Sequence, residues 1–104
     1  MFKVTKSAAK QIKASSAAGD MEELGLRIAA ERAQDGSINY QMGFDEVTTD
    51  DIMVNSSGVD IIISRLNQPL LQGATMDFVE IEPGQERFIF LNPNDPSFVP
   101  PTEE

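Results

Sequence analysis

Two groups of carboxylates are the residues of this chain whose types and spacing could do chemistry. The loop Asp45–Asp51 places four carboxylates within seven residues, and such oxygen ligands suit Ca²⁺ or Mg²⁺. Their spacing is not that of an EF-hand loop, so a solvated acidic loop is the favoured interpretation. The second group surrounds a Pro-Gly turn and consists of Asp77, Glu80, Glu82 and Glu86. Paired carboxylates catalyse acid–base steps when their environments separate their pKa values, but no feature marks a pocket here, and a solvated hairpin end is favoured.

The absence of two residue types narrows the chemistry further. The chain has no cysteine and no histidine. Thiolate and imidazole metal sites, cysteine nucleophiles and Ser-His-Asp triads all need those residues. An ordinary cysteine-ligated iron–sulfur cluster cannot be held by this chain alone. We therefore expect no catalytic residue, no cofactor and no resident metal ion.

The charge is spread unevenly along the chain. Residues 1–19 carry four lysines and no acid, whereas residues 20–104 carry the other four basic residues and all 17 acids. The two parts therefore carry +4 and −13, which add up to the net charge of −9. This acidity argues against general nucleic-acid binding by the body of the domain, because phosphates would be repelled.

Three of the lysines are spaced to share one face of a helix. Lys6, Lys10 and Lys13 follow the spacing i, i+4, i+7 within a helix expected over Lys6–Ser16, for which Thr5 is the N-cap. A solvated basic face that offsets the acidic body is the favoured interpretation. The alternatives are a docking site for an acidic partner and, more weakly, contact with nucleic acid.

Alternating apolar residues predict a mainly β (α+β) domain. The expected strands are Phe2–Val4, Leu24–Arg32, Ile38–Phe44, Ile52–Val54, Val59–Ser64, Thr75–Glu82 and Arg87–Leu91, with a short helical turn at Leu66–Leu71. Asp35-Gly36 predicts a tight hairpin, because both residues accept positive φ, and Pro83-Gly84 predicts a second turn. The last strand is apolar on both faces, which indicates a central position.

The expected core follows from the same alternation. It consists of Leu26, Ile28, Tyr40, Met42, Val59, Ile61, Ile63, Leu71, Phe78, Phe88 and Phe90. At 104 residues the chain is expected to form one domain over residues 1–94, followed by an extended or disordered proline-rich acidic tail over residues 95–104. No apolar run is long enough for a membrane span or a signal core, so we expect a cytoplasmic protein.

Six segments together resemble the A-type carrier family of iron–sulfur cluster biogenesis, the HesB/IscA-like proteins. They are VTKSAAKQIK, GLRIAA, the hairpin ending in MGFDE, GVDIIIS, PLLQGATMDFVE and FIFLNPN, in an order that spans nearly the whole chain. The resemblance implies a compact sandwich or half-barrel of small mixed sheets with an N-terminal helix. It also implies that the hairpin tip, Gln34–Ser37, and the C-terminal segment, Asp95–Pro101, meet where the family binds its cluster.

The family's cluster ligands are missing from this chain. Asp35 stands where the family has its first cysteine, five residues before the aromatic position matched by Tyr40. The family's Cys-Gly-Cys falls on Val99, Pro100 and Pro101. A single carboxylate does not replace three thiolates. The former cluster face is therefore a candidate surface for a protein partner, with Asp35, Gly36, Phe98 and Val99 as the candidate contact residues.

The resemblance implies an accessory role without catalysis. Three segments are similar to those of a cysteine-free branch of the family that accompanies sulfur oxidation. They are DGSINYQMGFD, EPGQ and FIFLNP. That likeness implies a regulatory interaction protein that does not itself bind a cluster. The alternative is an accessory factor in cluster assembly that handles iron or a cluster shared with a partner's thiols.

Overall fold

The structure is a computed structural model that describes residues 2–95. Its elements are β1 (Lys3–Val4), α1 (Lys6–Ala18), β2 (Gly25–Arg32), β3 (Ile38–Asp45), β4 (Asp51–Ser56), β5 (Val59–Ser64), α2 (Gln68–Leu71), β6 (Thr75–Glu82) and β7 (Gln85–Leu91). Each expected strand is present, and β5 and β6 have the expected bounds. The helix α1 continues two residues beyond its expected end, to Ala18.

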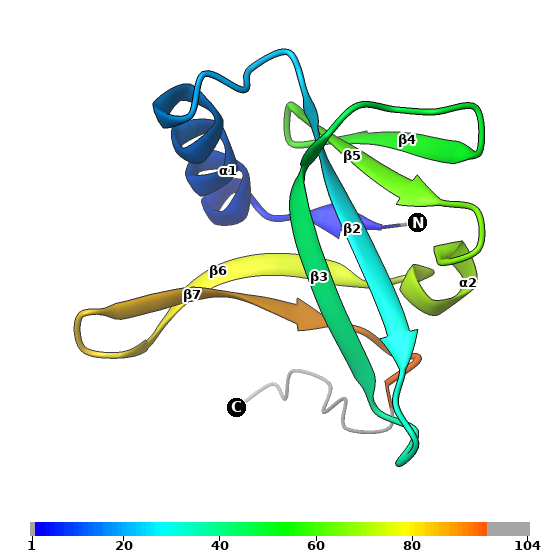
Figure 1. Cartoon of the computed structure of the whole chain (residues 1–104). Helices are drawn as coiled ribbons and strands as arrows, with labels where there is room; N and C mark the ends of the chain where they lie inside the picture. Colours follow the sequence, from blue (N-terminus) through cyan, green and yellow to red (C-terminus); the bar gives the residue numbers. More distant parts are fainter. Residues whose placement is uncertain (1, 96–104) are drawn as a thin grey trace.

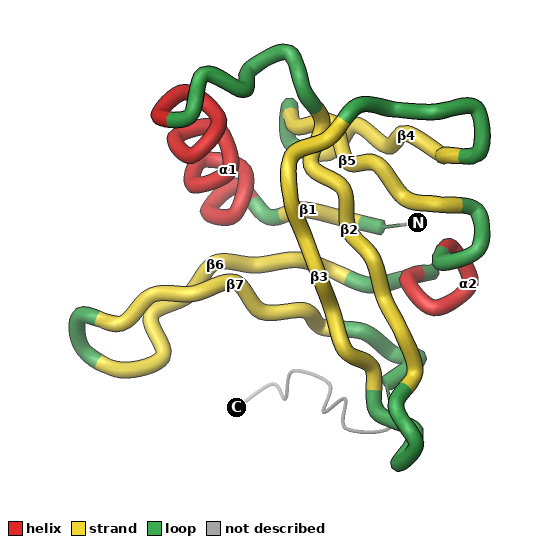
Figure 2. Tube along the Cα trace, viewed as in Figure 1, coloured by secondary structure: helices red, strands yellow, loops and turns green. Residues whose placement is uncertain are grey.

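The strands form two small mixed sheets (Figures 1 and 2). One has the order β1-β6-β7, with β1 parallel to β6, and the other has the order β3-β2-β5-β4, with β2 parallel to β5. The remaining neighbours are antiparallel. Val4 joins the two sheets, because its N–H donates to Ser56 Oγ at 3.0 Å and its carbonyl accepts from Ser57 Oγ at 2.7 Å. The expected fold of small mixed sheets with an N-terminal helix is confirmed.

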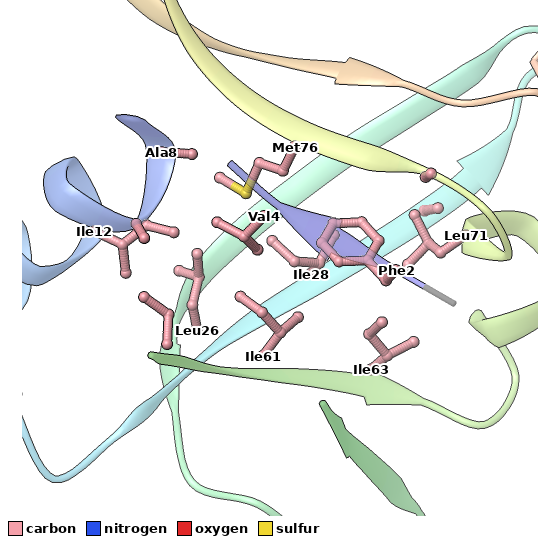
Figure 3. Close-up of a cluster of buried hydrophobic side chains, with 14 of the residues drawn as sticks. Phe2, Val4, Ala8, Ile12, Leu26, Ile28, Ile61, Ile63, Leu71 and Met76 are labelled. Atoms are coloured by element: carbon pink, nitrogen blue, oxygen red, sulfur yellow. The ribbon is translucent and has the colours of Figure 1, made fainter. Parts of the chain in front are cut away.

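The core lies between the two sheets and α1 (Figure 3). Six expected core residues are buried: Leu26, Ile28, Val59, Ile61, Ile63 and Leu71. Four more are half-buried and pack against this core: Tyr40, Phe78, Phe88 and Phe90. Phe2, Val4, Ile38, Ala74 and Met76 are buried as well, although the expected list did not contain them.

Two expectations about the core are wrong. The strand β7 lies at the edge of its sheet and not at its centre, so Ile89 and Leu91 are only half-buried. Met42 is 44% exposed, although it has the inward parity of β3. The reason is that β3 is an edge strand whose inner face at Met42 borders a surface groove and not a packed layer.

The helix α1 begins where the sequence predicts. Thr5 has extended backbone angles, and its Oγ1 accepts a hydrogen bond from the N–H of Ala8 at 3.2 Å. The same hydroxyl donates to Asp77 Oδ1 at 2.6 Å, which fixes the helix start against β6. Within residues 2–95 no helix is long and apolar enough to cross a membrane.

Candidate functional site

The hairpin tip between β2 and β3 is a three-residue loop. The N–H of Gly36 donates to the carbonyl of Ala33 at 3.0 Å, and the N–H of Ala33 donates to the carbonyl of Ser37 at 2.8 Å. This is a type I turn followed by a left-handed residue, a common hairpin connection. Only Gly36 takes positive φ, at 90°, so the expectation that Asp35 would share that conformation is wrong.

The carboxylate of Asp35 is used to hold this turn together. Its Oδ1 accepts hydrogen bonds from the Oγ of Ser37 at 2.6 Å and from the N–H of Ser37 at 3.0 Å. The hydroxyl of Ser37, more than its backbone N–H, holds the pKa of Asp35 below its usual value. Such Asx turns are local, so the geometry of the tip depends on residues within the loop itself.

The C-terminal end of the described chain is fixed against α2. Asn92 is buried, and its Nδ2 donates to the carbonyl of Leu70 at 2.6 Å, while its Oδ1 accepts from the N–H of Asn94 at 2.9 Å. Asn94 Nδ2 donates to the carbonyl of Gln72 at 2.9 Å. These side-chain bonds replace a strand ladder and determine where the chain leaves the domain.

Arg32 connects the hairpin tip to this C-terminal segment. Its Nη1 donates to the carbonyl of Gly36 at 2.6 Å, and its Nη2 donates to the carbonyl of Asn94 at 3.3 Å. The hairpin tip is thus joined to Asn94, the residue before the expected segment Asp95–Pro101, and the meeting of the tip with that segment stays a prediction. The candidate residues Phe98, Val99, Pro100 and Pro101 lie outside the described residues.

Tyr40 lies beneath this site. Its ring stacks on Phe90 with centroids 4.2 Å apart and an interplanar angle of 11°. Its hydroxyl is buried and has no hydrogen-bond partner within residues 2–95. Burial raises the pKa of Tyr40. The nearby Asn92 side chain opposes this shift only in part, so the folded state does not replace the hydrogen bonds that the hydroxyl makes with water.

Replacing Tyr40 by phenylalanine is expected to leave Tm unchanged or to raise it slightly. The substitution removes a desolvated hydroxyl and keeps the ring that stacks on Phe90. Ser37→Ala is the control, because it deletes a hydroxyl that is bonded to Asp35 and should lower Tm. A lower Tm for Tyr40→Phe than for Ser37→Ala would mean that the phenol has a partner in solution.

The acidic loop contains an ion pair and no metal cage. Asp45 Oδ2 accepts from Arg27 Nε at 2.7 Å, and the two carboxylate oxygens of Asp51 accept from Arg27 Nη1 and Nη2 at 2.7 Å each. The N–H and Oγ1 of Thr48 also donate to Asp51, at 2.8 and 2.9 Å. Hydrogen bonds from Arg27 lower the pKa of both carboxylates, and the pKa of Asp51 lies well below its usual value. Two acids of this loop are thus ordered by an arginine, whereas a fully solvated loop was expected.

The basic face of α1 is exposed. Lys6, Lys10 and Lys13 all point to solvent, and no salt bridge joins them to an acid within the described part of the chain. The Nζ of Lys13 lies across the β4–β5 turn, 2.9 Å from the position that a Cβ on Gly58 would occupy. The face is therefore present as the sequence predicts.

Sequence reasoning missed the two arginines that organise these sites. Arg27 and Arg32 each pair with groups distant in sequence, up to 62 residues away for Arg32 and Asn94. The available signal was that Arg27 lies between the apolar residues Leu26 and Ile28, in a chain whose next loop is rich in carboxylates. Among residues 2–95, no group of three or more His, Cys, Asp or Glu side chains could hold a metal ion.

Comparison with known proteins agrees with this fold. Residues 1–95 match the family described as iron-sulphur cluster biosynthesis. The iron-sulfur cluster insertion protein ErpA of Histophilus somni (strain 2336) is 34% identical over 91 residues, which cover 86% of this chain and 80% of that protein. An uncharacterised protein of Bradyrhizobium diazoefficiens is 32% identical over 95 residues, which cover 90% of this chain and 89% of that protein.

A solved structure supports the same assignment. The crystal structure of IscA with the [2Fe-2S] cluster superposes with a TM-score of 0.75 at 25% identity, and the match covers 89% of this chain and 86% of that one. The small mixed sheets with an N-terminal helix are thus a fold that this chain shares with a solved structure. The chain belongs to the A-type carrier family of iron–sulfur cluster biogenesis proteins.

Proposed function

We propose that this chain is a non-catalytic member of its family that has given up cluster carriage and acts as an accessory or regulatory interaction protein. One observation carries the proposal: the chain contains no cysteine. Val99, Pro100 and Pro101 stand at the family's C-terminal ligand motif, and none of these side chains has an atom that binds iron. Iron–sulfur clusters in proteins are held mainly by thiolates.

The remaining candidate ligand does not fit a cluster either. Asp35 supplies oxygen where the family supplies sulfur, and its Oδ1 is committed to two hydrogen bonds with Ser37. One exposed carboxylate on a turn would hold iron only weakly and could not bridge a second iron through sulfur. The donor set therefore disagrees with the group that relatives such as IscA bind.

The finer assignment within the family rests on sequence likeness. The segments DGSINYQMGFD, EPGQ and FIFLNP resemble DsrR, a cysteine-free A-type protein associated with the dissimilatory sulfite reductase system of sulfur oxidisers. This likeness supports a role in the regulation of sulfur oxidation. Neighbouring sulfite reductase genes would support this role, whereas neighbouring cluster-assembly genes would favour a role in cluster assembly.

The former cluster face is our candidate for the partner surface of this function. The hairpin tip carrying Asp35 and Gly36 lies beside the segment that leads to Phe98 and Val99, because Arg32 joins the two. The partner is expected to be a protein. The exposed lysines of α1, which form no salt bridge within residues 2–95, favour a second, weaker candidate. That candidate is regulation through contact with an acidic protein or with RNA.

Anaerobic incubation with ferrous iron and sulfide tests the proposal. The purified protein is expected to remain colourless, without stoichiometric iron, because it offers no thiolate. A cysteine-containing relative treated in parallel is the positive control. Stable visible absorption of the monomer with bound iron would refute the proposal.

A second arm of the same experiment addresses the alternative. If the protein shares a cluster with a partner's thiols, then adding a small thiol such as glutathione should produce a coloured complex that elutes with the protein. We expect no such complex. Its formation would favour the role as an accessory factor in cluster assembly.

A further inference from the structure

An apolar groove opens between α1, β3 and β7, away from the former cluster face. It has a volume of about 190 Å³, and its apolar lining comes from Ile12, Leu26, Met42, Phe44 and Phe88. Met42 is 44% exposed here, while Phe44 and Phe88 are half-buried. The Phe88 ring also packs against Phe78, with centroids 4.8 Å apart. Exposed methionine beside aromatic rings is typical of adaptable binding surfaces.

A pair of glutamates lies beyond the groove, further along the β6–β7 hairpin. This hairpin projects from the body of the domain beside α1 (Figure 1). Phe78 pairs with Phe88, and two residues further out Glu80 pairs with Glu86. Residues two apart share a face of a strand, so Glu86 lies on the face of Phe88. The surface is therefore apolar near the body and acidic toward the hairpin end.

The glutamate pair is unfavourable without a cation. Like charges directly opposite each other destabilise an antiparallel pair. Both side chains are exposed, and neither forms a salt bridge within residues 2–95. An ammonium or guanidinium group placed between them would remove this repulsion. The hairpin thus favours a positively charged group next to an apolar side chain seated in the groove.

Neither the lysines of α1 nor the tail of this chain meets that requirement. Ser15, which lines the groove, and the lysines lie on opposite sides of α1 at 100° per residue, and Lys13 lies over the β4–β5 turn. The tail from Pro96 to Glu104 holds two acids and no basic residue. The helix α1 of a second copy would present its lysines beside Ala8, Ala9 and Ile12, which are buried in its own core, so that helix cannot fill the groove.

We propose that this groove binds a segment of a partner protein in which an exposed leucine or similar apolar side chain is followed by lysine or arginine. The apolar side chain contacts Met42, Phe44 and Phe88, and the cation lies between Glu80 and Glu86. This inference rests on the proposed function as an interaction protein and adds the chemistry of the partner. The surface is separate from the hairpin tip, so a partner could contact both.

Methionine-methyl NMR on the full chain tests the proposal. The probe is a short peptide with two leucines flanked by lysines, added to protein labelled with ¹³C at the methionine methyls. We expect a saturable shift of the Met42 methyl. Met53 is the internal control, because it is 46% exposed but lies on β4, outside the groove. Equal shifts at Met42 and Met53, or no saturable shift at Met42, would overturn the proposal.

Charge variants test the acidic end of the groove. Glu80→Gln with Glu86→Gln should weaken peptide binding roughly threefold to tenfold at low salt, as expected for two exposed ion pairs. Glu46→Gln with Asp50→Asn removes the same charge from the β3–β4 loop and should leave the affinity unchanged. Equal weakening by both double variants would mean that peptide binding depends only on the net charge of the protein. That result would refute the assignment of the cation to Glu80 and Glu86.

Two further measurements distinguish the proposed partner segment from other possible occupants of the groove. A peptide with serine in place of both leucines should not shift Met42, and equally tight binding by that peptide would refute the apolar contact. A Met42 shift that depends on protein concentration without peptide would show that a second copy covers the groove, which would also refute the proposal. Cluster formation in the iron–sulfide experiment would refute the proposed function and leave this NMR result standing.

Discussion

Replacing Ile28 by alanine is expected to lower the free energy of unfolding by about 2–5 kcal/mol. Ile28 is fully buried in β2, an interior strand of the four-stranded sheet, and faces the core shown in Figure 3. The substitution removes three carbons from a packed interior and leaves a cavity. A domain of this size has about 5–15 kcal/mol of total stability, so this change removes a large fraction of it.

Urea denaturation followed by circular dichroism measures this loss. Met53→Ala is the matched control, because Met53 also lies in the four-stranded sheet but is 46% exposed, and its truncation should cost less than about 1 kcal/mol. The slope of the unfolding free energy against urea should be the same for both variants. A loss under 1 kcal/mol for Ile28→Ala would mean that the core beside β2 is not packed as described.

Local patterns were sufficient to predict most elements of the fold. Alternation along β2 identified Leu26, Ile28 and Ala30 as its inner face, and all three are buried. Alternation gives the parity of a residue but not the layer that covers it. Met42 has the correct parity and yet borders a groove, because the position of α1 relative to β7 is a tertiary property. The same limit explains why a strand apolar on both faces, β7, could lie at an edge.

The candidate site was predictable where it depends on adjacent residues. The turn at Asp35-Gly36 follows from local chemistry, although Gly36 alone supplies the positive φ. The family resemblance predicted that the chain beyond Asn94 returns to the tip. It did not predict that Arg32 joins the tip to Asn94 itself. An arginine that joins Gly36 to Asn94 leaves no periodic signal, because its partners are backbone carbonyls. The groove was missed for a similar reason, since its lining comes from four elements.

The order of the β3–β4 loop depends on one cation. Arg27 reaches Asp45, Asp51 and the carbonyl of Glu46, so a single side chain holds both ends of the loop. The Asp51 side chain is only 3% exposed, which makes this pair different from an ordinary surface salt bridge. Removing the cation would leave a desolvated carboxylate without a counterion. An uncompensated buried charge strongly destabilises the folded state.

Replacing Arg27 by methionine is therefore expected to lower Tm by several degrees at neutral pH. Arg65→Met, which removes an exposed arginine that forms no salt bridge within residues 2–95, is the control and should change Tm little. Adding Asp51→Asn to Arg27→Met should recover part of the lost Tm, because an amide, unlike a carboxylate, needs no counterion. A double variant with a Tm no higher than that of Arg27→Met would show that the loss comes from the hydrogen bonds to Asp45 and Glu46 and not from an unpaired Asp51.

The pH dependence follows from the direction of the pKa shift. Hydrogen bonds from Arg27 hold the pKa of Asp51 below its ordinary value of 3.8, so the folded state favours the ionised carboxylate. The stabilisation is complete above the unfolded pKa and is lost as the pH falls through the folded pKa. The difference in Tm between wild type and Arg27→Met should be constant near neutral pH and should narrow as the pH falls below about 4. A difference that widens on acidification would contradict the assigned ion pair, since protonated Asp51 no longer needs the guanidinium.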